Sequence, residues 1–372
     1  MEFSMLSSLL DQMLDAGIPG YDCAVYYKHQ PVFRRSGGFS DRENAVPMRA
    51  DLIYYIYSAT KVLTVTCALQ LMERGDLRLT DALSDYLPEY RAMRVKAGGG
   101  TVPAQKPITI RDLLCMTGGF GYDLESPAVQ ACRRATGGAC PTREVVRALA
   151  EEPLLFQPGT RWNYSLGHDI LGAVIEVVSG QTFGEYMRRH IFEPCGMRDT
   201  AFRRTPDRDA RFCPEYLYQE QTGQIVPMPS ANPYILGPAF ESGGAGLMST
   251  VDDYCRFQEA FISGRLLSPE TVDAMQRPQL TGQELAGFDW PGLQGRYSYG
   301  YGVRTPLPSS GLAPEFGWGG AAGALTMMDT HNDITLFYAQ HVLHSGGSKA
   351  EPLRGRIKRA VYEGLGLPWH KH

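Results

Sequence analysis

The stretch Tyr57-Ser58-Ala59-Thr60-Lys61 joins two segments with opposite residue patterns. Before it, the aromatic run at residues 52–56 is typical of a buried strand end. After it, apolar residues recur at the spacing of an amphipathic helix that stops near Gly75. Ser58 is therefore expected at or just inside a helix N-terminus, and Lys61 follows one turn later on the same face. The pattern predicts a strand-to-helix connection with Ser58 at its corner.

A hydroxyl and an amine placed in this way are a chemically competent pair. Free N–H groups at a helix N-terminus favour an oxyanion, and an amine three residues on is within reach of the hydroxyl. A lysine buried in such a setting can release its proton near neutral pH and act as a base. The alternative is an ordinary N-cap serine followed by a surface lysine. Reading back three positions from every lysine in the chain, only Lys61 finds a serine, Ser58.

Composition excludes several other classes of protein. The chain has 372 residues, enough for one large domain or two closely joined ones. Its net charge of −4 gives no electrostatic reason to expect nucleic acid or an anionic membrane as a partner. No apolar run approaches the roughly 18 residues that a membrane helix needs. Acidic residues interrupt the amphipathic segment Met1–Gly20, which favours a packed helix over a signal peptide and predicts a cytoplasmic protein.

Cysteine and histidine give little support for a metal or a cofactor. The eight cysteines include no Cys-x-x-Cys, and without an export signal they are interpreted as reduced, mostly buried thiols. A Cys132–Cys140 disulfide stays open as an alternative. His341 and His344 are spaced like metal ligands, but a solvated strand end or loop is favoured. We therefore expect neither a metal nor a cofactor.

The distribution of strand and helix patterns predicts an α/β protein with an inserted helical region. Strand patterns occur near both ends of the chain, and helical patterns dominate the middle. Residues 1–60 plus 297–372 are expected to form an α/β domain. Residues 61–296 are expected to form a helical region with long loops, and the active site is expected at the interface. The expected strands lie at 22–27, 30–35, 297–303, 324–329 and 334–340, and the expected loops at 94–107, 204–238 and 281–296.

Two further segments contain candidate functional groups. Tyr164 follows a Pro-Gly turn and precedes a buried helix, so it can project from a loop into a cleft. A phenol beside an ammonium group can relay a proton, although a packed core tyrosine is the common alternative among twenty tyrosines. The small residues of Gly317–Gly323 allow a close backbone approach, so that the N–H of Ala321 could donate to an oxyanion. A bulge or turn is the alternative there.

The order of these motifs resembles the serine β-lactamase-like family, most closely the class C β-lactamase-related esterases called family VIII carboxylesterases. The resemblance rests on Ser58–Lys61, then Tyr164-Ser165, then Trp318-Gly319-Gly320. Residues 113–119 and 242–250 also look like two glycine-containing segments of that family. The resemblance implies a β-lactamase/transpeptidase-like fold, in which helices and a mainly helical inserted region flank an antiparallel sheet. No Gly-x-Ser-x-Gly is present, which removes the α/β-hydrolase fold as a rival.

The same resemblance implies a role for each matching residue. Ser58 would be the acylated nucleophile, and Lys61 with Tyr164 would handle its proton, the immediate base being left open. The backbone N–H groups of Ser58 and Ala321 would form the oxyanion hole. The segment Trp318, Gly319, Gly320 would contact the substrate.

Two departures from the family pattern shape the expected substrate. Leu166 stands where β-lactamases of this class have an asparagine, and Trp318 stands where they usually have a lysine or histidine. Both changes remove groups that recognise a β-lactam, so esters or thioesters are favoured. Leu166, Tyr122 and Phe240 are expected to contact the substrate, the two aromatic residues as part of an acyl pocket. Phe120 and Trp290 are further candidates for that pocket, and core packing is the alternative for all four aromatic residues.

The resulting prediction is a serine hydrolase that forms an acyl-enzyme on Ser58 and hydrolyses small or medium acyl esters. An acyltransferase that uses the same acyl-enzyme is the close alternative. β-Lactamase or D-amino-acid peptidase activity is disfavoured by Leu166 and Trp318. A non-catalytic scaffold is disfavoured because Ser58, Lys61 and Tyr164 occur together. The expected partner is a small-molecule acyl ester, and the oligomeric state is left open.

Overall fold

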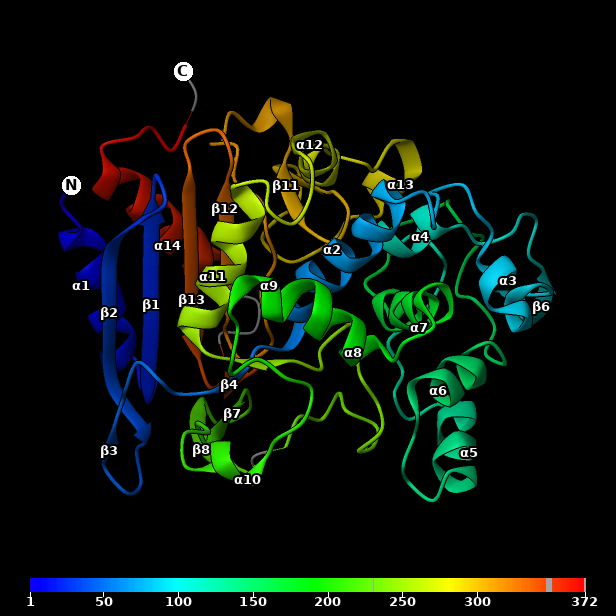
Figure 1. Ribbon diagram of the computed structural model, residues 1–372, viewed down its shortest axis with the longest axis horizontal. Coiled ribbons are helices and arrows are strands. Elements are labelled where there is room, and N and C mark those ends of the chain that lie inside the picture. Colours follow the sequence, from blue (N-terminus) through cyan, green and yellow to red (C-terminus); the bar gives the residue numbers. More distant parts are fainter. Residues whose placement is uncertain (230, 346–349, 371–372) are drawn as a thin grey trace.

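A five-stranded antiparallel sheet forms one end of the molecule, in a computed structural model that describes residues 1–229, 231–345 and 350–370. Its strand order is β12-β13-β1-β2-β3. The strands are β1 (Gly20–Tyr27), β2 (Gln30–Asp41), β3 (Val46–Pro47), β12 (Leu325–Asp329) and β13 (Ile334–Gln340). Helices α1 (Ser4–Asp15) and α14 (Ala350–Leu365) pack together on one face of the sheet, and α11 (Val251–Ile262) covers the other (Figure 1). The two ends of the chain therefore meet in one sheet.

The β1–β2 hairpin was predicted from the sequence and is confirmed. Its two turn residues, Lys28 and His29, have φ values of 51° and 61°. Two consecutive left-handed residues make the type of tight turn whose twist matches that of the flanking strands. Strand β2 continues to Asp41, six residues beyond the expected end at Arg35.

The remaining elements form a helical region beside the sheet and several short strands. The helices of this region are α2 (Thr60–Glu73), α3 (Leu83–Tyr86), α4 (Ile110–Leu114), α5 (Pro127–Ala135), α6 (Thr142–Leu149), α7 (Gly167–Ser179), α8 (Phe183–Met187), α9 (Glu193–Cys195), α10 (Pro206–Asp209), α12 (Pro269–Gln276) and α13 (Gly282–Ala286). Single turns of other helix types are η1 (Tyr57–Ala59), η2 (Pro88–Tyr90), η3 (Arg188–Phe192) and η4 (Pro308–Ser310). The short strands are β4 (Tyr54–Tyr55), β5 (Arg94–Ala97), β6 (Gly100–Pro103), β7 (Glu215–Gln219), β8 (Gln224–Met228), β9 (Met248–Ser249), β10 (Tyr297–Tyr299), β11 (Arg304–Pro306) and β14 (Val342–Leu343).

Helix α2 is the buried centre of the molecule. Its residues from Thr60 to Leu69 are all buried, and it packs against α7 and α8. A helix that is covered on all sides belongs to the interior of a large protein. In Figure 1 it runs from the sheet into the helical region. Ser58 lies one turn before it and is therefore held where the two parts of the fold meet.

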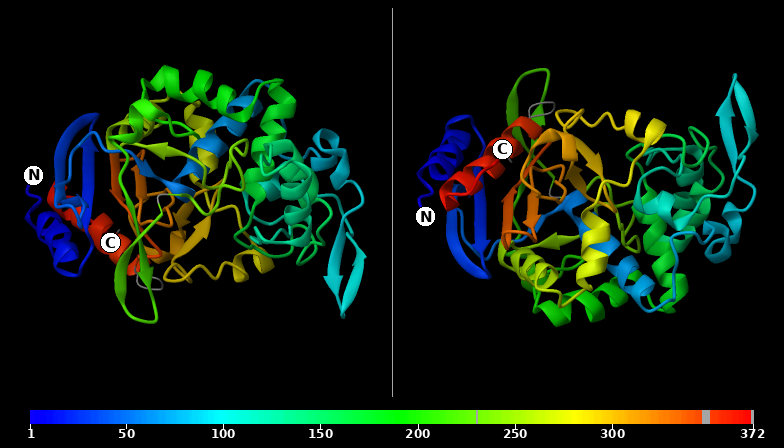
Figure 2. Two further views of the ribbon diagram at one scale, coloured as in Figure 1. Left: turned by 90° about the horizontal axis from the view of Figure 1, so that it is seen from below. Right: turned by 90° about the horizontal axis from the view of Figure 1, so that it is seen from above.

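Three segments expected as loops contain regular structure. Residues 94–107 include the hairpin β5–β6, which projects from the body in Figure 2. Residues 204–238 include α10 and the hairpin β7–β8, and residues 281–296 include α13. Strands β5 and β6 are almost wholly exposed, so their sequences lack the alternation that reveals a half-buried strand. The strand expected at residues 52–56 is reduced to β4, which pairs with β9.

Helix α11 lies within the segment 61–296 but packs on β1 and β13 of the sheet. Thr250 is its N-cap. The side chain of Thr250 accepts the backbone N–H of Asp253 at 3.0 Å. Part of the expected helical region is thus physically attached to the sheet.

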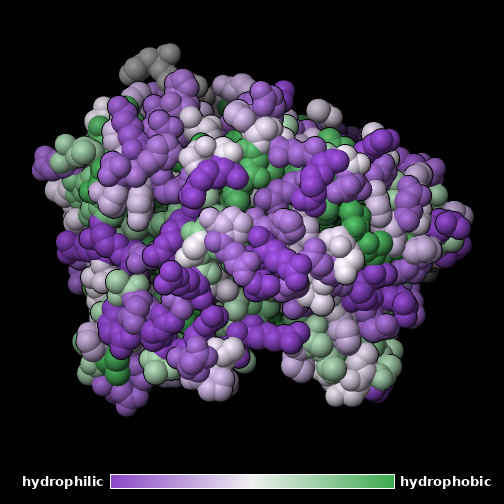
Figure 3. Space-filling model, in the orientation of Figure 1, coloured by the Kyte–Doolittle hydropathy of each residue, from purple (hydrophilic) through white to green (hydrophobic). Residues whose placement is uncertain are grey.

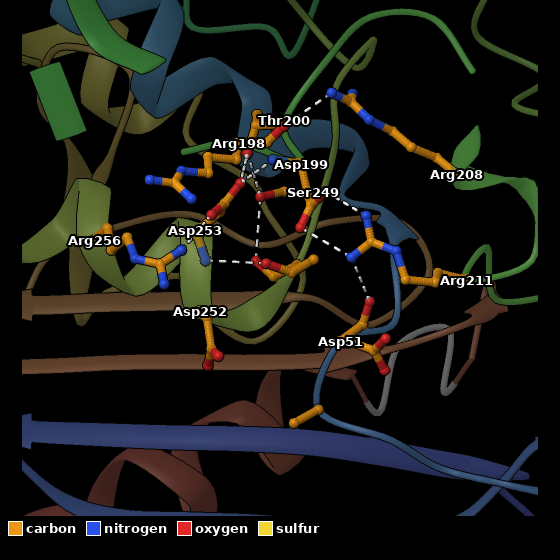
Figure 4. A network of polar contacts seen from close by, with 12 residues as sticks. Asp51, Arg198, Asp199, Thr200, Arg208, Arg211, Ser249, Asp252, Asp253 and Arg256 are labelled. Carbon is orange, nitrogen blue, oxygen red and sulfur yellow. Dashed lines mark hydrogen bonds and ion pairs between the residues drawn. The ribbon is translucent and has the colours of Figure 1, made fainter. Parts of the chain in front are cut away.

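A polar network fixes the start of α11 to the segment before α10 (Figure 4). The carboxylate of Asp253 is buried and accepts the backbone N–H of Asp199 at 2.7 Å and the hydroxyl of Thr200 at 3.1 Å. Arg256 donates to the other oxygen of Asp253 at 2.6 Å. Arg211 bridges the network to the segment before β4 by donating to Asp199 and to the carbonyl of Asp51. The network therefore supports the β4–β9 pair from which Ser58 follows.

In the described part of the chain, no helix combines the length and apolar character needed to cross a bilayer. The face shown in Figure 3 is mostly hydrophilic, with apolar residues interspersed. Few large hydrophobic side chains are strongly exposed, and they come from separate elements: Met1, Met5, Phe39, Val46, Val102 and Leu155.

Candidate active site

Ser58 sits on η1, directly after a residue in an uncommon backbone conformation. Tyr57 has φ of 47°, in the left-handed region that bulky residues rarely adopt. Its side chain is fully buried, and its hydroxyl donates to the carboxyl of Glu215 at 2.5 Å. Such a conformation persists only where the surrounding contacts hold it. The contact with Glu215 helps to set the direction in which the chain presents Ser58.

Lys61 and Tyr164 both reach the hydroxyl of Ser58. The Nζ atom of Lys61 lies 3.3 Å from the Oγ atom of Ser58, and the Tyr164 hydroxyl donates to the same Oγ at 2.6 Å. Lys61 is fully buried and also donates to the carbonyl of Gly244 at 2.7 Å. Its Nζ atom lies 4.5 Å from the ring centre of Tyr164 and 5.5 Å from that of Tyr122. This is the geometry of a nucleophile with two groups able to accept its proton.

Aromatic neighbours hold Tyr164 in place. Its ring stacks on Tyr122 with a centroid distance of 5.5 Å and on Trp318 with one of 5.7 Å. The indole N–H of Trp318 donates to the Tyr164 hydroxyl at 3.3 Å. Just before it in the chain, Asn163 donates to the carbonyl of Phe120 at 2.8 Å and fixes the loop. Tyr164 is therefore oriented by both stacking and hydrogen bonding.

A cavity of about 360 Å³ opens beside Ser58 and Tyr164. Five of its twelve lining residues are tyrosine or tryptophan, which makes it suited to an apolar group. It brings together Ser58, Tyr164 and four of the six residues expected to bind substrate, namely Tyr122, Trp318, Gly319 and Gly320. Ala321, the expected oxyanion donor, is also in its wall. The remaining lining residues are Tyr234, Trp290, His344, Ser345 and Arg354.

The absence of a side chain at Gly320 allows the segment 319–321 to approach Ser58. A Cβ atom on Gly320 would lie 2.4 Å from the carbonyl oxygen of Ile56, a backbone atom that cannot move aside cheaply. The Gly320 N–H donates to the carbonyl of Ala324 at 2.7 Å and closes a tight turn. The late strand expected at Trp318 is reduced to isolated bridges at Phe316, Gly317 and Gly319. The segment is thus a turn-like wall of the cavity.

Leu166 and Phe240, two of the residues expected to contact substrate, do not line this cavity. Leu166 precedes α7, is 4% exposed and lines a separate pocket of about 90 Å³ together with Phe120. Its backbone N–H donates to the carbonyl of Gly121, which anchors the loop that carries Tyr122. Phe240 is equally buried in the hydrophobic core. Both side chains contribute to packing, as apolar residues of this size commonly do.

The structure adds residues that no local sequence pattern indicated. Arg354, on the closing helix α14, donates to the carbonyl of Gly320 at 2.7 Å and to that of Ala324 at 3.2 Å. It places a cation in the wall of the cavity, although Trp318 occupies the position where the family usually has one. Arg354 is separated from Ser58 by most of the chain, so only the tertiary fold brings them together. Tyr234, from a loop after β8, is the second such residue.

The cysteines and histidines are arranged as single groups. The eight cysteines are buried and unpaired, so the Cys132–Cys140 disulfide left open by the sequence is not formed. His341 is buried between Tyr54 and Tyr216, and burial lowers its pKa to about 4. His344 is exposed at the rim of the cavity. In the described ranges, no group of three or more histidine, cysteine or acidic side chains could hold a metal ion.

Glu215 makes the stability of the protein depend on pH. Burial raises its pKa to about 8, although the hydrogen bond from Tyr57 acts to lower it. A carboxyl group with a raised pKa in the folded state stabilises the fold fully below its unfolded pKa, and this contribution is lost as the pH rises through about 8. Glu215→Gln keeps an acceptor for Tyr57 and cannot ionise. We expect it to raise the melting temperature at pH 9 and not at pH 4.

The expected size is about 1.4 kcal/mol for each unit of pKa shift removed. Thermal unfolding followed by circular dichroism from pH 4 to pH 9 measures the effect. Asp51→Asn, which changes a partly exposed carboxyl group, is the control and should change the pH dependence little. If the melting temperature of Glu215→Gln fell with rising pH as steeply as that of the wild type, another group would be responsible for the pH dependence.

Comparison with known proteins identifies the family. The family model described as Beta-lactamase matches residues 6–359. The chain belongs to this family. Esterase EstB of Burkholderia gladioli is 31% identical, with 96% of this chain and 94% of EstB covered. Lovastatin esterase of Penicillium rubens is 30% identical, with 85% and 86% covered.

A solved structure agrees with this membership. EstCE1, described as a hydrolase with promiscuous acyltransferase activity, superposes with a TM-score of 0.79 at 25% identity and covers 96% of this chain and 97% of its own. The predicted β-lactamase/transpeptidase-like fold is therefore confirmed. The family includes both esterases and acyltransferases, so membership alone leaves the reaction open.

Proposed function

We propose that this member of the β-lactamase family is a carboxylesterase that hydrolyses small or medium acyl esters through an acyl-enzyme on Ser58. The observation that carries the proposal is the convergence of Lys61 and Tyr164 on one hydroxyl, at 3.3 Å and 2.6 Å. An esterase also agrees with the relatives EstB and lovastatin esterase, which are similar along most of the chain.

In the proposed reaction, the Oγ atom of Ser58 attacks the carbonyl carbon of the ester. Its proton passes to Lys61 or Tyr164, and the carbonyl oxygen becomes an oxyanion. The backbone N–H groups of Ser58 and Ala321 are proposed to donate to that oxyanion. When the tetrahedral intermediate collapses, the alkoxide leaves with the proton. Water then attacks the acyl group by the reverse sequence and restores Ser58.

The cavity walls support an apolar acyl or alcohol group as the substrate class. Trp290 lies 4.8 Å from Tyr164 and 5.2 Å from Trp318, measured between ring centres, so these rings form a continuous aromatic surface. Such a surface favours flat or branched apolar groups over strongly hydrated ones. The partner is accordingly proposed to be a small-molecule ester.

Acyl transfer to an alcohol is the second candidate. It needs the same acyl-enzyme and differs only in the group that accepts the acyl chain. The observation that favours it is the aromatic wall, which can bind an apolar alcohol better than it binds water. EstCE1 is described as carrying out both reactions.

Stopped-flow kinetics with p-nitrophenyl butyrate tests the proposal, with Ser58→Ala as the control. We expect a burst of nitrophenol equal to the enzyme concentration, absent in the control, and slow opening of a chromogenic cephalosporin. Added short-chain alcohols separate the two candidates. A butyrate ester product that replaces free butyrate indicates a transferase. Identical traces for wild type and Ser58→Ala would refute the acyl-enzyme, and fast cephalosporin opening would make the protein a β-lactamase.

A further inference from the structure

Asp169 is a buried acidic residue that the proposed reaction does not use. It lies in the first turn of α7 and is 1% exposed. Its Oδ1 atom accepts the hydroxyl of Ser242 at 2.5 Å and the backbone N–H of Gly244 at 3.1 Å. Its Oδ2 atom is buried and has no hydrogen-bond partner among the described residues. A buried carboxylate oxygen without a hydrogen bond is costly unless a positive charge lies nearby.

Lys61 approaches the same loop from α2. Its Nζ atom donates to the carbonyl of Gly244 at 2.7 Å. One turn later on α2, Thr64 donates to the carbonyl of Gly243 at 2.7 Å. Gly244 therefore binds Asp169 through its N–H and Lys61 through its C=O, so a single residue separates the two charged side chains.

Gly244 permits this close approach because it has no side chain. A Cβ atom there would lie 2.5 Å from the Oδ2 atom of Asp169. The glycine-rich loop at residues 242–246 thus brings a negative charge on α7 close to a positive charge on α2. The sequence had indicated this loop only as a family-like segment.

The other titratable groups that face Lys61 and Asp169 carry no opposing charge. The rings of Tyr122 and Tyr164 face the ammonium group of Lys61. His168, next to Asp169 on α7, is fully buried. Burial, together with the charge of Lys61, lowers its pKa to about 3, so it is neutral near pH 7. Burial raises the pKa of Asp169, while the Lys61 charge and the hydrogen bonds from Ser242 and Gly244 act to lower it. Asp169 is the carboxyl group in this set.

We propose that Asp169 is the counter-charge and positioning residue of Lys61. It holds the glycine loop against α2, and it stabilises the ammonium form that arises when the proton of Ser58 moves to Lys61. The inference rests on the proposed function, because Lys61 acts on Ser58 only in that scheme. The proton leaves the Oγ atom of Ser58, resides on the Nζ atom of Lys61, and passes on to the departing alkoxide.

The first test follows the labelling of Ser58 by a fluorophosphonate ester as a function of pH. Asp169→Asn keeps an acceptor for Ser242 and Gly244 and removes the charge. Without the carboxylate the neutral amine is favoured, so the acid limb of the labelling profile should move to lower pH, by about one to three pH units. The maximal rate should fall as well.

Thr64→Val removes the other anchor of the loop without changing a charge, and it should slow labelling while leaving the acid limb in place. An acid limb that stays in place in Asp169→Asn would overturn the inference.

A stability cycle provides a second test that needs no chemistry at Ser58. Thermal unfolding is compared for Lys61→Met, Asp169→Asn and the double variant. If the two charges compensate each other, the double variant should melt at a higher temperature than Lys61→Met alone. If the double variant lost as much melting temperature as the two single variants lose together, the inference would be overturned. A wild-type protein in which Ser58 is not labelled would instead overturn the proposed function, and the cycle would still report on the charge pair.

Discussion

Lys61→Met is expected to slow acylation of Ser58 by about 10³- to 10⁴-fold. Methionine has a similar length and suits the fully buried site, so the variant removes the amine with little loss of packing. A positioned general base commonly contributes about 10²- to 10⁴-fold, and the ammonium charge adds to that effect. The burst rate with p-nitrophenyl butyrate measures the loss directly.

Lys28→Met is the matched control, because Lys28 is exposed at the β1–β2 turn and far from the site in sequence and fold. It should acylate at the wild-type rate. A Lys61→Met protein that is folded, as judged by its melting curve, and still acylates at the wild-type rate would remove Lys61 from proton transfer. Tyr164 would then be the sole base.

Glu315→Ala is expected to lower the free energy of unfolding by about 3–5 kcal/mol. Glu315 is fully buried and accepts hydrogen bonds from Arg304 at 2.8 Å, from Tyr297 at 2.9 Å and from Lys358. Removing the carboxylate leaves Arg304 and Lys358, two buried cations, without the anion that they share. The effect should reach the site, because the backbone of Arg304 pairs with that of Gly317, next to Trp318.

Urea unfolding measures this loss, and Glu144→Ala is the control. Glu144 forms an exposed ion pair with Arg147, and its loss should cost less than about 1 kcal/mol. Burial acts to raise the pKa of Glu315, but Arg304 and Lys358 outweigh burial and hold the pKa below its ordinary value. The stabilisation by Glu315 is therefore present at neutral pH and is lost as the pH falls through that lowered pKa. If Glu315→Ala and Glu144→Ala lowered the free energy of unfolding equally, a coupled buried network around Glu315 would be contradicted.

The parts of the fold that were predictable from the sequence have local signals. The first hairpin follows from two strand patterns, at 22–27 and 30–35, that only two residues separate. Ser58 and Lys61 could be singled out because their spacing follows from the geometry of one helical turn. The structure brings Tyr164, singled out by the family resemblance, into hydrogen-bond contact with Ser58.

The residues that sequence reasoning misplaced or missed depend on tertiary contacts. Leu166 stands at the position of the family's asparagine, but its contact partners decide whether its side chain faces the cavity or the core. Arg354 reaches the cavity from a helix at the far end of the chain, and no local pattern predicts that meeting. Asp169 lies in the first turn of a helix, and only the contacts of Gly244 with Asp169 and Lys61 connect it to the site. Residue types and their spacing indicate which reactive side chains the chain contains, whereas long-range packing decides which of these side chains lie in contact.

Mass spectrometry of the quenched reaction with p-nitrophenyl butyrate tests the central claim most directly. Wild-type protein is stopped in acid during the burst and digested, and the modified peptide is sequenced. The account predicts one added butyryl group, located on Ser58 and absent from Ser58→Ala. A butyryl group on another residue, or unmodified protein during full turnover, would contradict an acyl-enzyme on Ser58.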